Sequence, residues 1–311
     1  MTLDPEMAAL LEALRALPRF ETMTPLEVRA ATEDLARNAP AGPHLHAVED
    51  RRVATVACSL PVRIYRPEHS VALIVYFHGG GWVIGNLDSA DAALRDFAHR
   101  TRCCIVSVDY RLAPEHPFPA AVMDAENALN WAASACIELA GQRVPLLLAG
   151  ESAGGTLAAV TAILARDHQG PSIAGQILFY PVTNSDLTTP SYDAFAEDYF
   201  LTRPIMRWFW NHYAPQEHQR RDFRAAPLLT KDLTHLPPAL IQTAEYDPLR
   251  DEGEAFGRRL AAAGVQVTVQ RRAGLVHSFV TMAPLVRAAR AAVDDAIEWV
   301  GQRVANATAA K

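Results

Sequence analysis

Six short segments of the chain are apolar almost without interruption. They cover residues 71–77, 103–108, 145–149, 173–179, 239–243 and 265–269. An uninterrupted apolar strand is buried on both faces, as in a parallel sheet that helices cover. The runs therefore predict buried strands of an α/β fold rather than an all-helical bundle or a half-exposed antiparallel sheet.

Helical patterns alternate with these runs. They cover residues 89–100, 119–139, 153–167, 250–263 and 284–304. Such alternation predicts a mostly parallel sheet flanked by helices. Two further strands, over residues 46–57 and 60–65, are expected near one edge and bring the sheet to eight strands.

The first forty residues predict two helices. Asp4 is placed to cap the first, with Pro5 at its first helical position, and Thr24 and Glu27 form a capping-box pattern that opens the second. One face of the first helix is apolar through Met7, Leu10, Leu11, Leu14 and Leu17. This face predicts packing on the main body or, as the alternative, a lid over a pocket.

One segment breaks the alternation of strands and helices. Residues 184–237 have no clear strand pattern and are rich in aromatic residues. The segment is too long for a plain loop, so an inserted helical subdomain is expected. The predicted organisation is cap helices over 1–45, a catalytic core over 46–183, the helical insertion over 184–237 and the rest of the core over 238–311.

The net charge of the chain bears on which binding partners are expected. The chain has 29 Lys and Arg against 35 Asp and Glu, a formal net charge of −6. Mild acidity argues against a partner that is a nucleic acid or an anionic membrane surface. The N-terminus lacks a basic stretch followed by an apolar core, and no run approaches ~20 apolar residues, so neither a secretory signal nor membrane insertion is expected.

Cysteine usage indicates the compartment. Cys58, Cys103, Cys104 and Cys136 show no C-x-x-C spacing, so neither a disulfide framework nor a zinc site is expected. Adjacent strand residues point to opposite faces of a sheet, which predicts the same for Cys103 and Cys104. These features favour a protein of the reducing cytoplasm.

The candidate nucleophile lies in a G-x-S-x-G motif. Gly150, Ser152 and Gly154 follow an apolar strand and precede a helical stretch. A sharp strand–turn–helix elbow would expose the Ser152 hydroxyl at the top of the sheet. The alternative is an ordinary glycine-rich turn after a strand.

A second glycine motif follows an earlier strand. Three glycines run between His78 and Trp82, where their backbone N–H groups, with that of Ala153, are placed to bind an oxyanion. A phosphate-binding loop is the alternative. Neither a following Gly-Lys-Ser/Thr nor a G-x-G-x-x-G pattern supports it.

A serine nucleophile needs an imidazole base and an acid that orients it. In such folds the acid and then the histidine follow the serine, each after a strand. His277 and Asp247 fit that order best, whereas His212 and His235 are expected on the surface or in the insertion. Rival acids are Glu245, Asp232 and Asp251, the last of which is interpreted as the cap of the next helix.

These motifs together resemble the hormone-sensitive-lipase-like family of α/β-hydrolase carboxylesterases. The resemblance extends over residues 71–279, and its stretches are 78–82, 109–120, 150–155, 246–252 and His277. Residues 109–120 form a proline-stiffened loop that leads into a helix at Pro119, to which we assign a structural role.

The resemblance implies a fold, a site and an activity. It implies a catalytic triad of Ser152, Asp247 and His277. It also implies an oxyanion hole made of the amides of Gly79, Gly80 and Ala153. It implies a cap built from the N-terminal helices and the insertion, which favours the lid interpretation. It also implies acyl transfer on esters of short to medium acids, with no metal or cofactor.

Several points stay open. Glu151 stands where the family usually has Asp or Thr, and Ser278 follows the histidine where Gly is usual, which leaves substrate preference undetermined. Trp82, Phe200 and Trp208 are candidate walls of an acyl pocket. Amidase, lactonase or peptidase activity on the same scaffold, a non-catalytic small-molecule receptor, and a homodimer remain alternatives.

Overall fold

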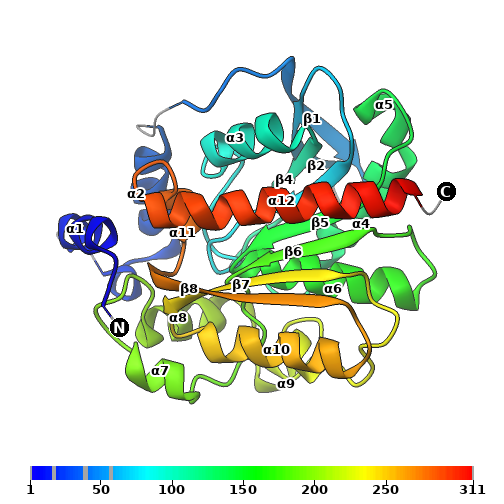
Figure 1. The fold of residues 1–311 in the computed structure, drawn as a ribbon. Helices are drawn as coiled ribbons and strands as arrows, with labels where there is room; N and C mark the ends of the chain where they lie inside the picture. Colours follow the sequence, from blue (N-terminus) through cyan, green and yellow to red (C-terminus); the bar gives the residue numbers. More distant parts are fainter. Residues whose placement is uncertain (1, 16–18, 38–40, 56–58, 310–311) are drawn as a thin grey trace.

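The protein is seen in a computed structural model that describes residues 2–15, 19–37, 41–55 and 59–309 (Figure 1). Eight strands form one sheet in the order β1-β2-β4-β3-β5-β6-β7-β8. The strands are β1 (Ala47–Ala54), β2 (Ser59–Arg66), β3 (Leu73–Phe77), β4 (Cys104–Val108), β5 (Leu146–Glu151), β6 (Gly175–Phe179), β7 (Ala239–Tyr246) and β8 (Val267–Val276).

The sheet is mostly parallel, as the apolar runs predict. Strands β3 to β8 are parallel to one another, and β2 is antiparallel to both β1 and β4. The expected α/β-hydrolase sheet of eight strands is confirmed, although residues 56–57 of the expected first strand lie outside the described residues. β3, β4, β5 and β6 are buried along their whole length because helices cover both faces.

Two helical layers enclose the sheet (Figure 1). Helices α3 (Asp91–Thr101) and α12 (Arg287–Ala309) pack on one face with the short α11 (Phe279–Met282). The opposite face is covered by α4 (Ala120–Ser134), α5 (Cys136–Ala140), α6 (Ala153–Asp167) and α10 (Arg250–Ala262). Two separate apolar cores result, one on each side of the sheet.

The helical stretch predicted over 119–139 consists of two helices. The chain turns at Ala135, between α4 and α5. Cys136 and Leu139 are buried in the core on their side of the sheet. The sequence signals no break there because neither Gly nor Pro interrupts the pattern.

The N-terminal capping patterns form as predicted. Asp4 Oδ1 accepts from the N–H of Glu6 at 2.9 Å and of Met7 at 3.1 Å at the start of α1 (Pro5–Leu14). Before α2 (Pro25–Arg37), the Thr24 N–H donates to Glu27 Oε2 at 2.8 Å, and the Glu27 N–H reaches Thr24 Oγ at 3.4 Å.

The first helix packs on the body. Met7 is fully buried and Leu11 nearly so, in the same apolar core as β8 and α12. The Asp4 N–H also donates to the Gly274 carbonyl at 3.0 Å, which joins the start of α1 to β8. The packing interpretation is therefore confirmed for these residues, and Leu17 lies outside the described residues.

The insertion between β6 and β7 is helical. It contains α7 (Pro190–Ala194), α8 (Arg203–Tyr213), α9 (Glu217–Arg220) and the 3-10 turn η2 (Pro227–Leu229). Another 3-10 turn, η1 (Phe20–Thr22), lies between α1 and α2. Helices α7 and α8 lie with α1, α2 and α11 at one end of the sheet, on the left of Figure 1. That is the end at which β8 leads into α11, hence the carboxyl end of the parallel strands.

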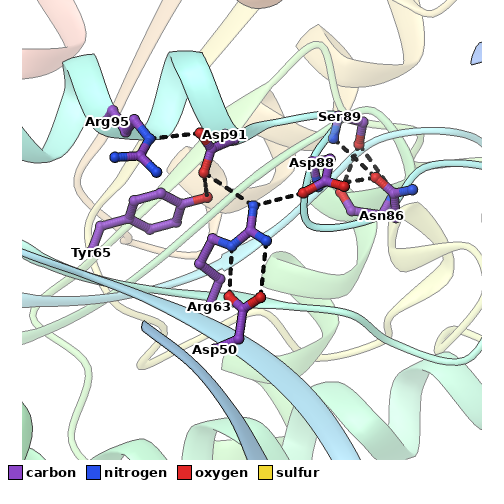
Figure 2. Close-up of polar contacts among 8 residues, drawn as sticks. All are labelled: Asp50, Arg63, Tyr65, Asn86, Asp88, Ser89, Asp91 and Arg95. Carbon is purple, nitrogen blue, oxygen red and sulfur yellow. Dashed lines mark hydrogen bonds and ion pairs between the residues drawn. The ribbon is translucent and has the colours of Figure 1, made fainter. Parts of the chain in front are cut away.

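A cluster of charged and polar side chains connects β1 and β2 to the neighbouring elements (Figure 2). The Arg63 guanidinium lies between Asp50, Asp88 and Asp91, with N···O distances of 2.7, 2.8 and 3.1 Å. The buried Tyr65 donates its hydroxyl to Asp91 Oδ1 at 3.0 Å. These contacts tie the antiparallel strands to α3 and to the loop before it.

The cysteine side chains are where the strand pattern predicts them. Cys103 and Cys104 are buried on opposite faces of the sheet, and both they and Cys136 are free thiols. Cys58 lies outside the described residues. Across the described ranges, no helix is long and apolar enough to cross a membrane.

Candidate active site

Ser152 lies in a tight elbow between β5 and α6. Its backbone has φ 53° and ψ −120°, a strained conformation for a residue with a side chain. A Cβ at position 150 would lie 2.2 Å from the Gly154 carbonyl oxygen, and one at position 154 would lie 2.0 Å from that of Phe77. Both flanking glycines are therefore required by the close approach of backbone, and the alternative of an ordinary turn does not fit.

Three side chains from different strand ends meet at this elbow. His277 Nε2 lies 2.9 Å from Ser152 Oγ, and His277 Nδ1 lies 2.8 Å from Asp247 Oδ2. Their relative exposures are 7% for Ser152, 4% for His277 and 0% for Asp247. The structure thus brings together the three residues that the motif order selects, after β5, β7 and β8.

The Asp247 carboxylate is oriented by its own loop. Its Oδ1 accepts from the Leu249 N–H at 2.9 Å, which leaves Oδ2 directed to the imidazole. With Nδ1 beside this carboxylate, the other ring nitrogen, Nε2, is the one within hydrogen-bond distance of the Ser152 hydroxyl.

The rival acids have other partners. Glu245 Oε2 accepts from the Gly274 N–H at 2.8 Å, in the strand that leads to His277. Asp232 is exposed and accepts from the N–H and hydroxyl of Thr234. The prediction that Asp251 caps the next helix is wrong. Asp251 is the second residue of α10, and its carboxylate accepts from the Ser191 N–H at 2.8 Å. Asp251 thereby tethers the insertion to α10.

The other two candidate histidines belong to the insertion, as expected. His212 is in α8, with its ring 4.5 Å from the ring centroid of Trp208. His235 is exposed at the end of the insertion.

Three backbone N–H groups lie unused around the elbow. Gly80 has φ 110° and Gly81 φ 58°, conformations that favour glycine. Among the described residues no acceptor is found for the N–H groups of Gly79 and Gly80. Ala153 is the first residue of α6, so its N–H has no partner within the helix.

His78 is a structural residue of this glycine loop. Burial lowers the pKa of the imidazole to about 4, so the ring is neutral near pH 7. Its Nδ1 lies 2.7 Å from the Gly79 carbonyl oxygen, and the ring stacks on Tyr110 at 4.3 Å. The Tyr110 hydroxyl in turn donates to the His78 carbonyl at 2.9 Å. These contacts hold the loop carbonyls, which leaves the N–H groups of the loop for a ligand.

The candidate wall residues have different environments. Trp82 is fully buried, and its ring stacks on Tyr213 of α8 with centroids 4.0 Å apart. Trp208 is half-buried in α8 against Phe209, and Phe200 is 39% exposed. The role of each in an acyl pocket stays a prediction.

Sequence reasoning did not find a buried pair next to the elbow. Glu151, one residue before Ser152, accepts a 2.6 Å hydrogen bond from the Tyr180 hydroxyl, and the Tyr180 ring contacts His277. The only sequence signal was Glu151 itself, a residue type that is unusual before the nucleophile. Nothing in the sequence identified Tyr180 as that partner.

The comparisons with known proteins agree with this site. Residues 74–281, more than half of the chain, match a family described by the alpha/beta hydrolase fold. The chain belongs to the α/β-hydrolase family. No cluster of three His, Cys, Asp or Glu suited to a metal ion occurs in the part of this hydrolase that the structure describes.

Its relatives are esterases. Carboxylesterase NlhH of Mycobacterium tuberculosis (strain CDC 1551 / Oshkosh) is 42% identical over 250 residues, 78% of each chain. Ethyl acetate hydrolase of Pseudomonas putida is 34% identical over 303 residues, 93% of this chain and 95% of that one. A thermostable esterase from Pseudomonas putida ECU1011 superposes with a TM-score of 0.92 at 35% identity, covering 97% and 98% of the two chains. The resemblance to hormone-sensitive-lipase-like esterases is confirmed.

Proposed function

We propose that this α/β hydrolase cleaves carboxylic esters of short to medium acids through an acyl-enzyme intermediate on Ser152. The observation that carries the proposal is the chain of hydrogen bonds from Ser152 through His277 to Asp247. The names of the relatives support ester hydrolysis, and that of ethyl acetate hydrolase supports a small acyl group.

In the acylation step, Ser152 Oγ attacks the ester carbonyl carbon while His277 Nε2 takes the hydroxyl proton. The buried Asp247 stabilises the imidazolium that forms. The amides of Gly79, Gly80 and Ala153 bind the developing oxyanion. The loss of one such donor typically costs about 10²–10³ in kcat.

Collapse of the tetrahedral intermediate breaks the bond to the leaving alcohol, which takes its proton from His277. Water then enters, His277 removes one of its protons, and the resulting attack on the acyl carbon regenerates Ser152 and releases the acid. Each proton leaves and returns through Nε2, so the cycle needs no further acid or base.

The insertion and the N-terminal helices are proposed as the cap of the acyl pocket. Their position at the carboxyl end of the parallel strands, where α/β folds bind ligands, supports this role. Phe200 and Trp208 remain the proposed wall residues from the insertion. Trp82 would support the pocket wall indirectly, because its ring is buried against α8.

The free buried thiols of Cys103, Cys104 and Cys136 support the proposed cytoplasmic location. They take no part in the proposed chemistry. A homodimer is compatible with this proposal but is not required by it, since Ser152, His277 and Asp247 come from one chain.

The test is Ser152→Ala, assayed with nitrophenyl acetate and with an organophosphate probe. We expect turnover and covalent labelling to disappear while the melting temperature changes little, because the deleted hydroxyl makes one hydrogen bond. Ester turnover that survives in Ser152→Ala would refute the proposal. A wild-type protein that neither turns over esters nor reacts with the probe would favour the receptor alternative.

The substrate class is tested with a panel. Nitrophenyl esters from acetate to palmitate are compared with matched anilides and lactones by kcat/KM. The proposal requires short and medium esters to exceed both the long esters and the amides. A preference for anilides or lactones would assign this scaffold to the amidase or lactonase alternative.

A further inference from the structure

A buried tyrosine bridges the nucleophile elbow and the proposed base. The Tyr180 hydroxyl donates to Glu151 Oε2 at 2.6 Å, and the Tyr180 ring meets the His277 ring edge-to-face with centroids 4.7 Å apart. Glu151 is the residue before Ser152 and is itself 5% exposed. A path of contacts therefore runs from Ser152 to His277 that does not use the hydrogen bond between them.

The position of Tyr180 is fixed by its backbone. Its φ is 35°, a rare conformation for a tyrosine, and its N–H donates to the Gln242 carbonyl in β7 at 2.6 Å. On either side of it, the Phe179 carbonyl accepts from the Ser152 N–H at 2.9 Å, and the Val182 N–H donates to the Ser152 carbonyl at 3.2 Å. The loop that carries Tyr180 is thus attached to the elbow itself.

The ring is also enclosed on a second side. Phe279, two residues after His277, contacts the Tyr180 ring edge-to-face at 4.8 Å. Tyr180 and Phe279 are both fully buried. The Tyr180 ring therefore rests against the His277 loop at two points and cannot turn away without breaking the hydrogen bond to Glu151.

We propose that Tyr180 and Glu151 are positioning residues for His277, an inference that rests on the proposed function. Acylation of Ser152 removes the hydroxyl proton, so the hydrogen bond between Ser152 Oγ and His277 Nε2 is lost in the acyl-enzyme. The imidazole is then held by Asp247 at one nitrogen, and the anchored Tyr180 ring restricts its rotation.

The titratable groups around this contact come from five elements. They are Glu151 at the end of β5, Tyr180 after β6, Asp247 after β7, Tyr76 in β3 and Tyr110 after β4. Burial first, and then the charge of Glu151, raise the pKa of Tyr180 and of Tyr76 well above the usual range. Burial, followed by Tyr213 and Glu151, does the same for Tyr110. The phenols stay neutral at working pH, so Glu151 and Asp247 are the acids of this set.

The experiment compares Tyr180→Phe and Glu151→Gln with the wild-type enzyme on a short nitrophenyl ester. Both variants keep the shape of the side chain. We expect kcat to fall about tenfold, because a base that is misplaced loses effective concentration, while KM stays within about twofold. The double variant should lose no more than the worse single variant, because the two side chains act as a unit.

The comparison of kcat with KM separates a positioning role from damage to the fold. A displaced imidazole lowers kcat and leaves ester binding in place, so KM should stay near the wild-type value in both single variants. A merely structural role for the pair would lower the number of titrated sites and leave kcat per site unchanged.

Tyr65→Phe is the matched control. It also removes a buried tyrosine hydroxyl bound to a carboxylate, that of Asp91, but it lies in the cluster of Figure 2 away from His277. Its kcat should equal that of the wild type. All values of kcat are normalised to sites titrated with the organophosphate probe, so that misfolded protein does not count.

A kcat of Tyr180→Phe within twofold of wild type, or a loss matched by Tyr65→Phe, would overturn the inference. Ser152→Ala is assayed in parallel. Activity in that variant refutes the proposed function, whereas an inactive Ser152→Ala beside an unaffected Tyr180→Phe refutes the positioning role alone.

Discussion

His277 Nδ1 lies 2.8 Å from Oδ2 of Asp247, a carboxylate with no exposed surface. We predict that Asp247→Asn lowers kcat by about 10³–10⁴, because an amide at this place selects the wrong imidazole tautomer. Steady-state kinetics on a nitrophenyl ester measures the effect. Glu245→Gln is the control: it keeps an acceptor for the Gly274 N–H and should retain most of the activity. If kcat fell by similar factors in both variants, Asp247 would not be the residue that orients His277.

The elbow glycines make a steric prediction. A Cβ in Gly154→Ala would lie 2.0 Å from the Phe77 carbonyl oxygen, a backbone atom that cannot yield without moving β3 or α6. We expect the free energy of unfolding to fall by about 2 kcal/mol or more, as with other overpacked sites, and esterase activity to be lost. Urea unfolding followed by circular dichroism measures the change.

Gly301→Ala is the matched variant in a helix. Position 301 is exposed in α12, and no atom lies within 4 Å of the added Cβ. The substitution should raise the free energy of unfolding by about 0.5–1 kcal/mol, because alanine loses less backbone entropy in a helix. Equal destabilisation of both variants would show that crowding at the elbow is not the cause.

The strands were predictable because burial on both faces leaves an uninterrupted apolar run. Polar residues concealed the ends of the last two strands. β7 continues beyond the predicted end at 243 through Glu245 to Tyr246, and β8 continues through Arg271 and Arg272 to Val276. Backbone pairing with a neighbour extends a strand regardless of side-chain polarity, and β8 is at the edge of the sheet, where polar side chains meet solvent.

The site was predictable where the chemistry demands fixed residue types in a fixed order. Ser152, Asp247 and His277 satisfy that demand, and the structure places them within hydrogen-bond distance. The role of an aromatic residue depends instead on tertiary packing. Trp82 has φ 61° and turns its ring onto Tyr213, and Tyr180 meets His277 only because its own φ is 35°. No periodicity or motif carries that information.

The ion pair between Arg111 and Asp124 supports the structural role of the loop over 109–120. Asp124 is fully buried and accepts from the Arg111 backbone N–H at 2.9 Å and from its guanidinium at 2.8 Å. Asp124→Ala should lower the free energy of unfolding by about 3 kcal/mol, because it leaves the arginine without this buried partner. Thermal and urea unfolding measure the loss.

If the loop has only a structural role, Asp124→Ala should not change the kcat of the molecules that remain folded. The folded fraction, counted by organophosphate titration, should retain a kcat close to that of the wild type. If kcat per titrated site fell in Asp124→Ala, the loop would have a role in catalysis as well as in structure.

Asp109, directly after β4, makes a prediction about pH. Burial, reinforced by the charge of Asp88, raises the pKa of its carboxyl to about 6. A carboxyl with a raised pKa in the folded state stabilises the protein while it is protonated, and this contribution is lost as pH rises from about 4 to about 6. Asp109→Asn should therefore raise the free energy of unfolding at pH 7.5 by about 1 kcal/mol, after allowance for partial solvent screening, and change it little at pH 4.

Melting temperatures of wild type and Asp109→Asn at pH 4, 5, 6 and 7.5 test this prediction. The curves should meet at the acidic end and separate above pH 6. Asp232→Asn is the control of opposite sign. The backbone N–H of Thr234 lowers the pKa of that exposed carboxyl to below this pH range, so the substitution should destabilise the protein at all four pH values. If Asp109→Asn gave the same shift at every pH, ionisation of Asp109 would not be the cause.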